Sequence, residues 1–99
     1  MNTPLSESQI AQALEGLPGW QQAEDKIARV FRFPDFVTAF GWMSSVALVA
    51  ESMNHHPEWR NVYGTVEVEL TTHDAGGITE LDFELARAMD RLGADRTAR

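Results

Sequence analysis

All three histidines of the 99-residue chain lie within one stretch, residues 51–82. His55 and His56 are neighbours, and His73 follows a segment that is predicted to form paired strands. Imidazole suits proton transfer at neutral pH, because its ordinary pKa is about 6.5. Any one of these rings could instead serve only a core or helix-end hydrogen bond. Because the paired strands would bring all three rings to one region, the spacing favours general acid–base chemistry there.

A metal site is the second use of three histidines and a carboxylate, which together can hold zinc or iron. Histidines that share an ion on a helix usually lie at positions i and i+4. His55 and His56 lie at i and i+1, so their rings point in different directions. The chain contains no cysteine, which excludes thiolate ligands, disulfides and a cysteine nucleophile. The pattern therefore predicts that the histidines hold no metal.

Two carboxylates flank the histidines. Glu51 lies one helical turn before His55, where it could orient that ring or hold its charge. Asp82 lies three residues after Thr79, which is the spacing of a capping box, so a catalytic use stays open beside a capping one. As a cap alone, Asp82 would tolerate replacement by Asn, because an amide still caps a helix. The three tryptophans are more often core residues, although one could stack on a flat ligand: Trp20, Trp42 and Trp59.

The elements that must position these groups follow from caps, turns and hydrophobic periodicity. In order, the sequence predicts a helix over 6–17, a short extended segment from 20, a strand over 27–33, a long helix from 34 to about 54, strands over 59–63 and 65–72 with His73 ending the second, and a helix over 79–93. Strand pairs joined by short turns favour an antiparallel sheet. We therefore expect an α+β fold: one domain over residues 1–99, with a four-stranded antiparallel sheet and three helices packed on one face, in the order α-β-β-α-β-β-α. Residues 1–4 and 94–99 are expected to be flexible.

The long helix is apolar around more than half of its circumference, which is more than one sheet face needs. One row holds Phe36, Phe40, Met43, Ala47 and Ala50, and the other holds Ala39, Trp42, Val46, Val49 and Met53. Deep burial within the monomer is one explanation. We favour a subunit contact for part of the helix, with Trp42, Val46 and Val49 as its outward residues.

Composition limits the partners. A formal net charge of −7 with scattered basic residues disfavours direct binding to nucleic acid. No segment has the roughly 20 uninterrupted apolar residues of a membrane span, and residues 1–8 do not resemble a signal peptide. We therefore expect a soluble, cytoplasmic domain with a small or uncharged partner.

The residues assembled above resemble the pterin-4a-carbinolamine dehydratase family. The family pattern is an acidic or similar residue, His-His-Pro, an aromatic residue, a histidine and an aspartate. In this chain the matching residues are Glu51, His55-His56-Pro57, Tyr63, His73 and Asp82. The wider run is also similar, at 33–36, 39–41, 46–48, 57–59 and 61–63. The resemblance extends over about residues 20–89.

The resemblance implies dehydration of 4a-hydroxytetrahydropterin to quinonoid dihydropterin, without metal or organic cofactor, in the recycling of the cofactor of aromatic amino-acid hydroxylases. It implies that His55 and His73 are the acid–base pair and that His56 chiefly binds substrate, with some share in base catalysis. The implied lining of the pterin site also includes Pro57, Thr72, Asp74 and Ala75, with Glu51 and Trp20 as further candidates for binding. Family members are homodimers or homotetramers.

Two other functions stay open beside dehydration. A mammalian member of the family also serves as a dimerization cofactor of a homeodomain transcription factor, so a module that binds a regulatory protein is one alternative. The other is a pterin-related role in molybdenum-cofactor metabolism.

Overall fold

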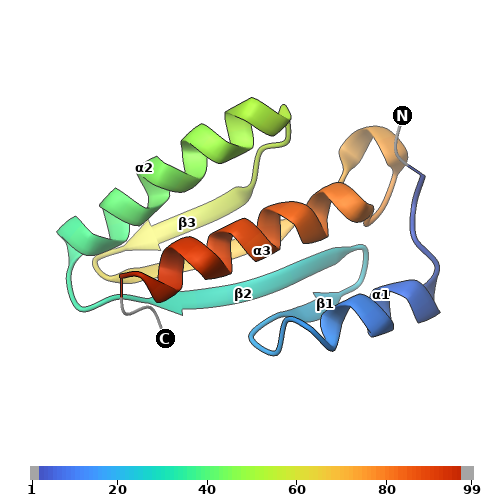
Figure 1. Ribbon diagram of the computed structural model, residues 1–99, viewed down its shortest axis with the longest axis horizontal. Coiled ribbons are helices and arrows are strands. Elements are labelled where there is room, and N and C mark those ends of the chain that lie inside the picture. Colours follow the sequence, from blue (N-terminus) through green and yellow to red (C-terminus); the bar gives the residue numbers. More distant parts are fainter. Residues whose placement is uncertain (1–2, 97–99) are drawn as a thin grey trace.

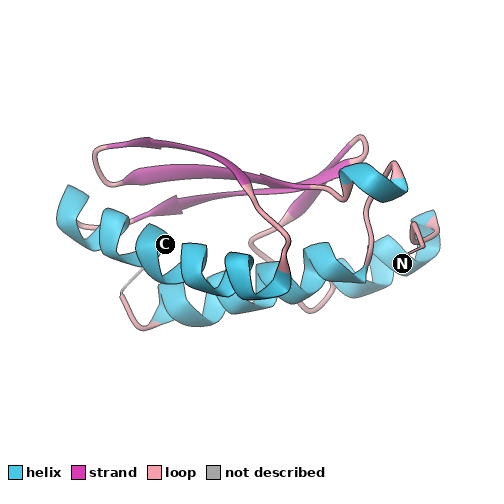
Figure 2. Cartoon of the chain, turned by 90° about the horizontal axis from the view of Figure 1, so that it is seen from above, coloured by secondary structure: helices cyan, strands magenta, loops and turns pink. Residues whose placement is uncertain are grey.

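Helices and strands alternate along the chain in the predicted order. The computed structural model describes residues 3–96. Its elements are α1 (Glu7–Leu14), β1 (Gln21–Ala23), β2 (Lys26–Arg32), α2 (Phe36–Met53), β3 (Glu58–Val62), β4 (Thr65–Leu70), the 3-10 helix η1 (His73–Ala75) and α3 (Glu80–Ala94). The strands pair antiparallel in the order β1-β2-β4-β3, and the three α-helices lie on one face of the sheet (Figure 1, Figure 2). The predicted α+β fold is confirmed.

The core lies between the sheet and the helices, as strand alternation requires. Ile27 and Phe31 of β2 point toward the helices, while Val30 points away and is partly exposed. Phe31 packs against Trp42 of α2, with ring centroids 4.4 Å apart. From α3, Phe83 closes the same core. These contacts fix how α2 and α3 lie across the sheet.

The two helices that bear on the predicted site begin at side-chain caps. Asp35 accepts a hydrogen bond from the Thr38 amide at the start of α2. At the start of α3, Thr79 and Asp82 form the predicted capping box. These carboxylates also lie at the positive ends of the helix dipoles, where negative charge is favoured.

The apolar surface of α2 divides between the core and the outside. Trp42 and Val46 are 0% exposed, and Val49 is partly buried, so the prediction that these residues face outward is wrong. The sheet packs against the row that contains them, and the other row is divided, since Ala50 is buried and Met43 is partly buried. Its large exposed members, with their neighbours, are Phe36, Val37, Phe40 and Leu48.

By length and composition alone, α2 could cross a membrane. Its mean hydropathy is 1.3 over 18 residues, and 22% of these residues are buried in the subunit. One such helix is weak evidence for a membrane span.

Most predicted boundaries differ from the structure by one to three residues. Strand β4 ends at Leu70, and His73 begins η1 instead of ending the strand. The reason is a tight reversal in which Thr72 bridges Gly77 and Gly76 adopts a positive φ of 77°. Helix α3 continues through a buried Gly93 to Ala94.

The predicted flexible ends lie partly outside the described residues, which exclude 1–2 and 97–99. Within the described part, Ala94 belongs to α3 and Arg96 donates hydrogen bonds to Ser45 and to the Leu92 carbonyl.

Candidate active site

The three histidines line one hollow of about 470 Å³. It lies where the end of α2, the segment after β4 and the start of α3 meet, and its volume is within the usual range for small-molecule sites. The lining residues are Met53, Asn54, His55, His56, Thr71, Thr72, His73, Asp74, Ala75 and Leu81. The fold therefore brings His73 beside the His55-His56 pair, although 17 positions separate it from His56 in the sequence.

The end of α2 determines where the first two rings point. Asn54 adopts a left-handed conformation with φ 51° and ψ 43°. Its amide donates to the Glu51 carbonyl at 3.1 Å, and the His55 amide donates to the Ala50 carbonyl at 3.0 Å. This is the Schellman arrangement, in which a left-handed residue ends a helix and turns the chain away. The turn sends His55 inward, where it is 8% exposed, and leaves His56 at the surface.

His55 is held by Asp82. Its Nε2 lies 2.6 Å from Asp82 Oδ1, and Asp82 is 0% exposed. The other oxygen, Oδ2, accepts from the Thr72 hydroxyl and from the Thr79 amide, each at 2.9 Å. All three partners can act as donors toward a carboxylate, which can only accept when it is ionised. Asp82 therefore caps α3 and orients His55 at the same time.

His56 is held by Glu51, with 2.8 Å between His56 Nε2 and Glu51 Oε1. The sequence predicted that Glu51 would lie beside His55, and this prediction is wrong. The turn at Asn54 removes His55 from the helix surface and returns the chain so that His56 lies over the last turn of α2. Both members of the pair are exposed, so the contact contributes little to stability.

His73 is held by Glu58, which no motif in the sequence singles out. His73 Nε2 lies 2.8 Å from Glu58 Oε2, and the other oxygen of Glu58 lies 2.8 Å from Lys26 Nζ. Hydrogen bonds from Lys26 and then from His73 hold the pKa of the Glu58 carboxyl below its ordinary value. The same carboxylate raises the pKa of Lys26. Glu58 is therefore ionised at neutral pH and accepts from both partners.

Each of the three rings thus directs Nε2 at a different carboxylate. A neutral imidazole that donates through Nε2 carries its proton there and presents an unprotonated Nδ1. Nδ1 is then the nitrogen that can take a proton from a substrate, or give one after the ring has been protonated. A hollow lined by several such rings can supply an acid and a base together.

The other predicted site residues divide into three groups. Thr72, Asp74 and Ala75 line the hollow. Two residues adjoin the hollow without lining it: Pro57 follows His56 in the chain, and Glu51 contacts the His56 ring. Trp20 lies elsewhere: it is 4% exposed, and its ring nitrogen donates to Asp90 at 2.8 Å, so it is a core residue and does not contact the hollow. Among residues 3–96, no group of three or more acidic or imidazole side chains is arranged to hold a metal ion.

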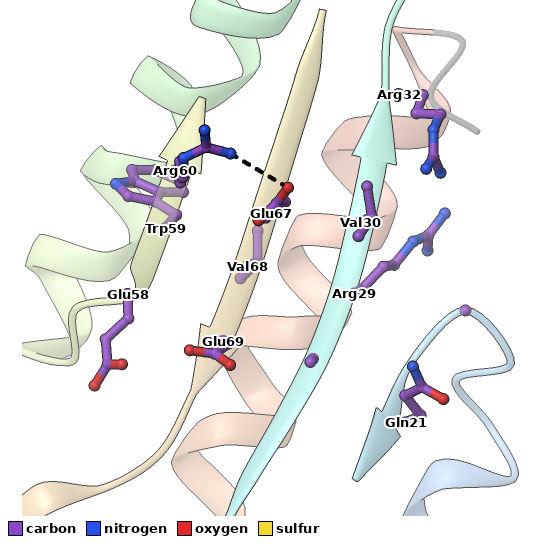
Figure 3. Close-up of a pocket in the computed structure, with 12 residues that line it drawn as sticks. Gln21, Arg29, Val30, Arg32, Glu58, Trp59, Arg60, Glu67, Val68 and Glu69 are labelled. Carbon is purple, nitrogen blue, oxygen red and sulfur yellow. Dashed lines mark hydrogen bonds and ion pairs between the residues drawn. The ribbon is translucent and has the colours of Figure 1, made fainter. Parts of the chain in front are cut away.

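A larger hollow of about 660 Å³ lies on the open face of the sheet (Figure 3). Its lining contains charged side chains of both signs from β2, β3 and β4, and no histidine among the described residues. Several of these charges already face a partner, such as Arg60 and Glu67 at 3.5 Å. Glu58 belongs to this lining and lies at one end of it, where β3 begins (Figure 3).

Comparisons with known proteins agree on one family. The family model described as pterin 4 alpha carbinolamine dehydratase matches residues 3–92. A protein of Rhodopseudomonas palustris (strain BisB18) named "Putative pterin-4-alpha-carbinolamine dehydratase" is 61% identical over 89 residues, covering 88% of each chain. One of the same name from Solibacter usitatus (strain Ellin6076) is 53% identical, covering 95% of this chain and 99% of its own. The crystal structure of a transcriptional coactivator/pterin dehydratase from Brucella melitensis aligns with a TM-score of 0.90 and 47% identity, over 92% of this chain and 99% of the other.

Proposed function

Because this chain belongs to the pterin 4 alpha carbinolamine dehydratase family, we propose that it dehydrates 4a-hydroxytetrahydropterin to quinonoid dihydropterin. The reaction would recycle the pterin cofactor of aromatic amino-acid hydroxylases. One observation carries the proposal: three imidazoles surround one hollow, and each is held through Nε2 by its own carboxylate. That arrangement suits a reaction made of two proton transfers.

The proposed step is balanced by protons alone. The C4a–O bond breaks, and the hydroxyl leaves as water after it takes a proton from an acid. The N5–H bond gives its proton to a base, and the nitrogen electron pair forms the C4a=N5 double bond. No electrons enter or leave, so the step needs no oxidant or reductant. The acid finishes one proton poorer and the base one proton richer, and exchange with water restores both.

His55 and His73 are the proposed acid and base. His55 approaches the hollow from the end of α2, and His73 from η1 after β4, so a flat ring between them would meet one imidazole on each side. His73 is 75% exposed in its side chain, which lets it exchange protons with solvent between turnovers. His56, also exposed but held by Glu51, is proposed to bind substrate, together with the lining residues Thr72, Asp74 and Ala75 and the adjoining Pro57.

The proposal is tested by stopped-flow decay of the carbinolamine with purified protein. We expect His55→Ala and His73→Ala each to lower kcat by about 10²–10⁴-fold, the usual contribution of a positioned acid or base. The double variant should approach the uncatalysed rate. His56→Ala is the comparison, because loss of a binding contact should raise KM more than it lowers kcat. A folded double variant that keeps near-normal turnover would refute the proposal.

The exposed apolar row of α2 supports two further statements. We propose that it contacts another copy of the chain, giving a homodimer or homotetramer, because Phe40 of this row and its neighbour Leu48 present large apolar side chains to solvent. The same surface favours the second candidate function, a regulatory module that binds a partner protein. Such a module would keep its binding in the His55→Ala, His73→Ala double variant, whereas the dehydratase would lose its turnover.

A further inference from the structure

We propose that Glu58 is a positioning residue, which holds the His73 ring in the orientation needed for proton transfer. This inference rests on the proposed function, since it assigns His73 to the chemistry. Glu58 itself lies on the outer face of the sheet and does not line the histidine hollow, so it acts only through His73.

The geometry leaves the Glu58 carboxylate little freedom. Oε2 lies 2.8 Å from His73 Nε2, and Oε1 lies 2.8 Å from Lys26 Nζ. Lys26 belongs to β2, Glu58 to β3 and His73 to η1, so three elements meet at one carboxylate. With both oxygens engaged, rotation of the Glu58 side chain would break at least one charge-assisted hydrogen bond. The carboxylate is therefore a fixed acceptor for the ring.

Sheet stability does not account for this placement. In the pairing of β3 with β4, Glu58 lies directly opposite Glu69, and like charges in that relation destabilise a sheet. Lys26 relieves part of this, since it also lies 3.6 Å from Glu69 Oε1. The ion pairs are partly exposed, and such pairs contribute little to folding. The contact with His73 is what Glu58 provides and Glu69 does not.

The His73 ring needs such a support more than His55 does. His55 is buried, whereas the side chain of His73 is largely exposed. Packing therefore does little to select one orientation of the His73 ring. A ring free to change rotamer would spend only part of its time in the geometry for proton transfer, and displacement of a reacting group is costly in rate.

The test compares Glu58→Ala with Glu69→Ala. The two glutamates lie opposite one another on the same face, both near Lys26, and only Glu58 contacts His73. We expect Glu58→Ala to lower kcat about tenfold, a fraction of the contribution of a positioned acid or base, with KM within about twofold. Glu69→Ala should keep both constants near those of the native chain. In a His73→Ala background, Glu58→Ala should cause no further loss, because its effect passes through that ring.

A second measurement does not depend on turnover. Carbon-13 relaxation of the His73 ring reports its motion on the picosecond-to-nanosecond timescale. We expect ring order to fall in Glu58→Ala and to stay unchanged in Glu69→Ala. Unchanged ring order together with unchanged kcat in Glu58→Ala would overturn the inference. If the native chain does not dehydrate the carbinolamine, the proposed function fails, and the relaxation measurement still decides whether Glu58 holds the ring.

Discussion

Replacing Asp82 by Asn tests whether the carboxylate beneath His55 matters for chemistry or only for capping α3. The substitution keeps the size of the side chain and exchanges one acceptor oxygen for a donor NH₂ group. Oδ2 accepts from Thr72 and Thr79, and Oδ1 faces His55 Nε2. The amide oxygen should take the Oδ2 position, because the opposite orientation sets NH₂ against two buried donors. The NH₂ group then faces His55.

The consequence for His55 can be worked out from this geometry. Facing a donor, Nε2 must present its lone pair, so the neutral ring moves its proton to Nδ1 and loses the basic nitrogen that the proposed mechanism uses. The usual contribution of a positioned acid or base is about 10²–10⁴-fold, and we expect a loss in kcat of about 100-fold, or about 2.7 kcal/mol. The same hydrogen bonds are then made by a neutral amide instead of a carboxylate, so the free energy of unfolding should also fall, by about 1 kcal/mol.

The assay is stopped-flow kinetics with urea unfolding measured in parallel. Asp35→Asn is the matched control, since Asp35 also caps a helix through its carboxylate. It lies at the other end of α2, about 27 Å from the histidines at 1.5 Å per residue. We expect Asp35→Asn to leave kcat unchanged. A folded Asp82→Asn protein with kcat within twofold of the native value would refute the reasoning and restore the simple capping interpretation.

Two further predictions concern assembly and acid stability. The native chain should sediment as a dimer or tetramer at micromolar concentration. Leu48→Glu, at a side chain that is 75% exposed, should dissociate it, because an unpaired charge in an interface costs several kcal/mol. Ala11→Glu on α1 is the control, and a monomeric native chain would contradict the prediction. A hydrogen bond from Thr38 lowers the pKa of Asp35 below its ordinary 3.8, and one from Lys26 lowers the pKa of Glu58 below its ordinary 4.5. The stabilisation of the fold by these two carboxylates should therefore be complete above the ordinary pKa values and be lost as the pH falls through the lowered pKa values. Thermal melts between pH 7 and pH 3 should show this loss, with a smaller slope in Glu58→Ala; an equal slope would count against it.

The elements could be predicted because their signals are local. The capping pairs Ser6–Gln9 and Thr79–Asp82 mark helix starts in the sequence, and both form in the structure. The alternation of Val66, Val68 and Leu70 with glutamates and threonine marks a half-buried strand. Convergence of the histidines followed from strand pairing, which returns the chain to the end of the long helix.

The carboxylate partners were harder to predict, because two of the three depend on geometry beyond local spacing. Glu51 was assigned to His55 on helical spacing, but the left-handed Asn54 ends the helix before that ring. Glu58 could be found only by combining strand alternation with the register that sets it opposite Glu69. In that register β4 ends beside the start of β3, which brings His73, shortly after β4, close to Glu58.

The surface of α2 shows a different limit. Its two apolar rows are similar in composition, and nothing within the helix says which one faces the sheet. Packing against the sheet decides which row faces inward. The Trp42 ring packs against Phe31 and Phe33 of the sheet side, with ring centroids 4.4 Å and 5.1 Å from that of Trp42. Sequence periodicity therefore predicted the excess of apolar surface but assigned the wrong residues to the outside.

The left-handed residue at the end of α2 joins two properties that are usually separable. Asn54 terminates a helix, and by the same pair of torsions it sets the directions of two neighbouring imidazoles. Residues other than Gly and Asn are disfavoured in this conformation. Few sequence changes at this position could alter the helix end without also redirecting the rings. Substitutions at this position, in evolution or engineering, should therefore change helix stability and histidine geometry together, since one backbone conformation determines both.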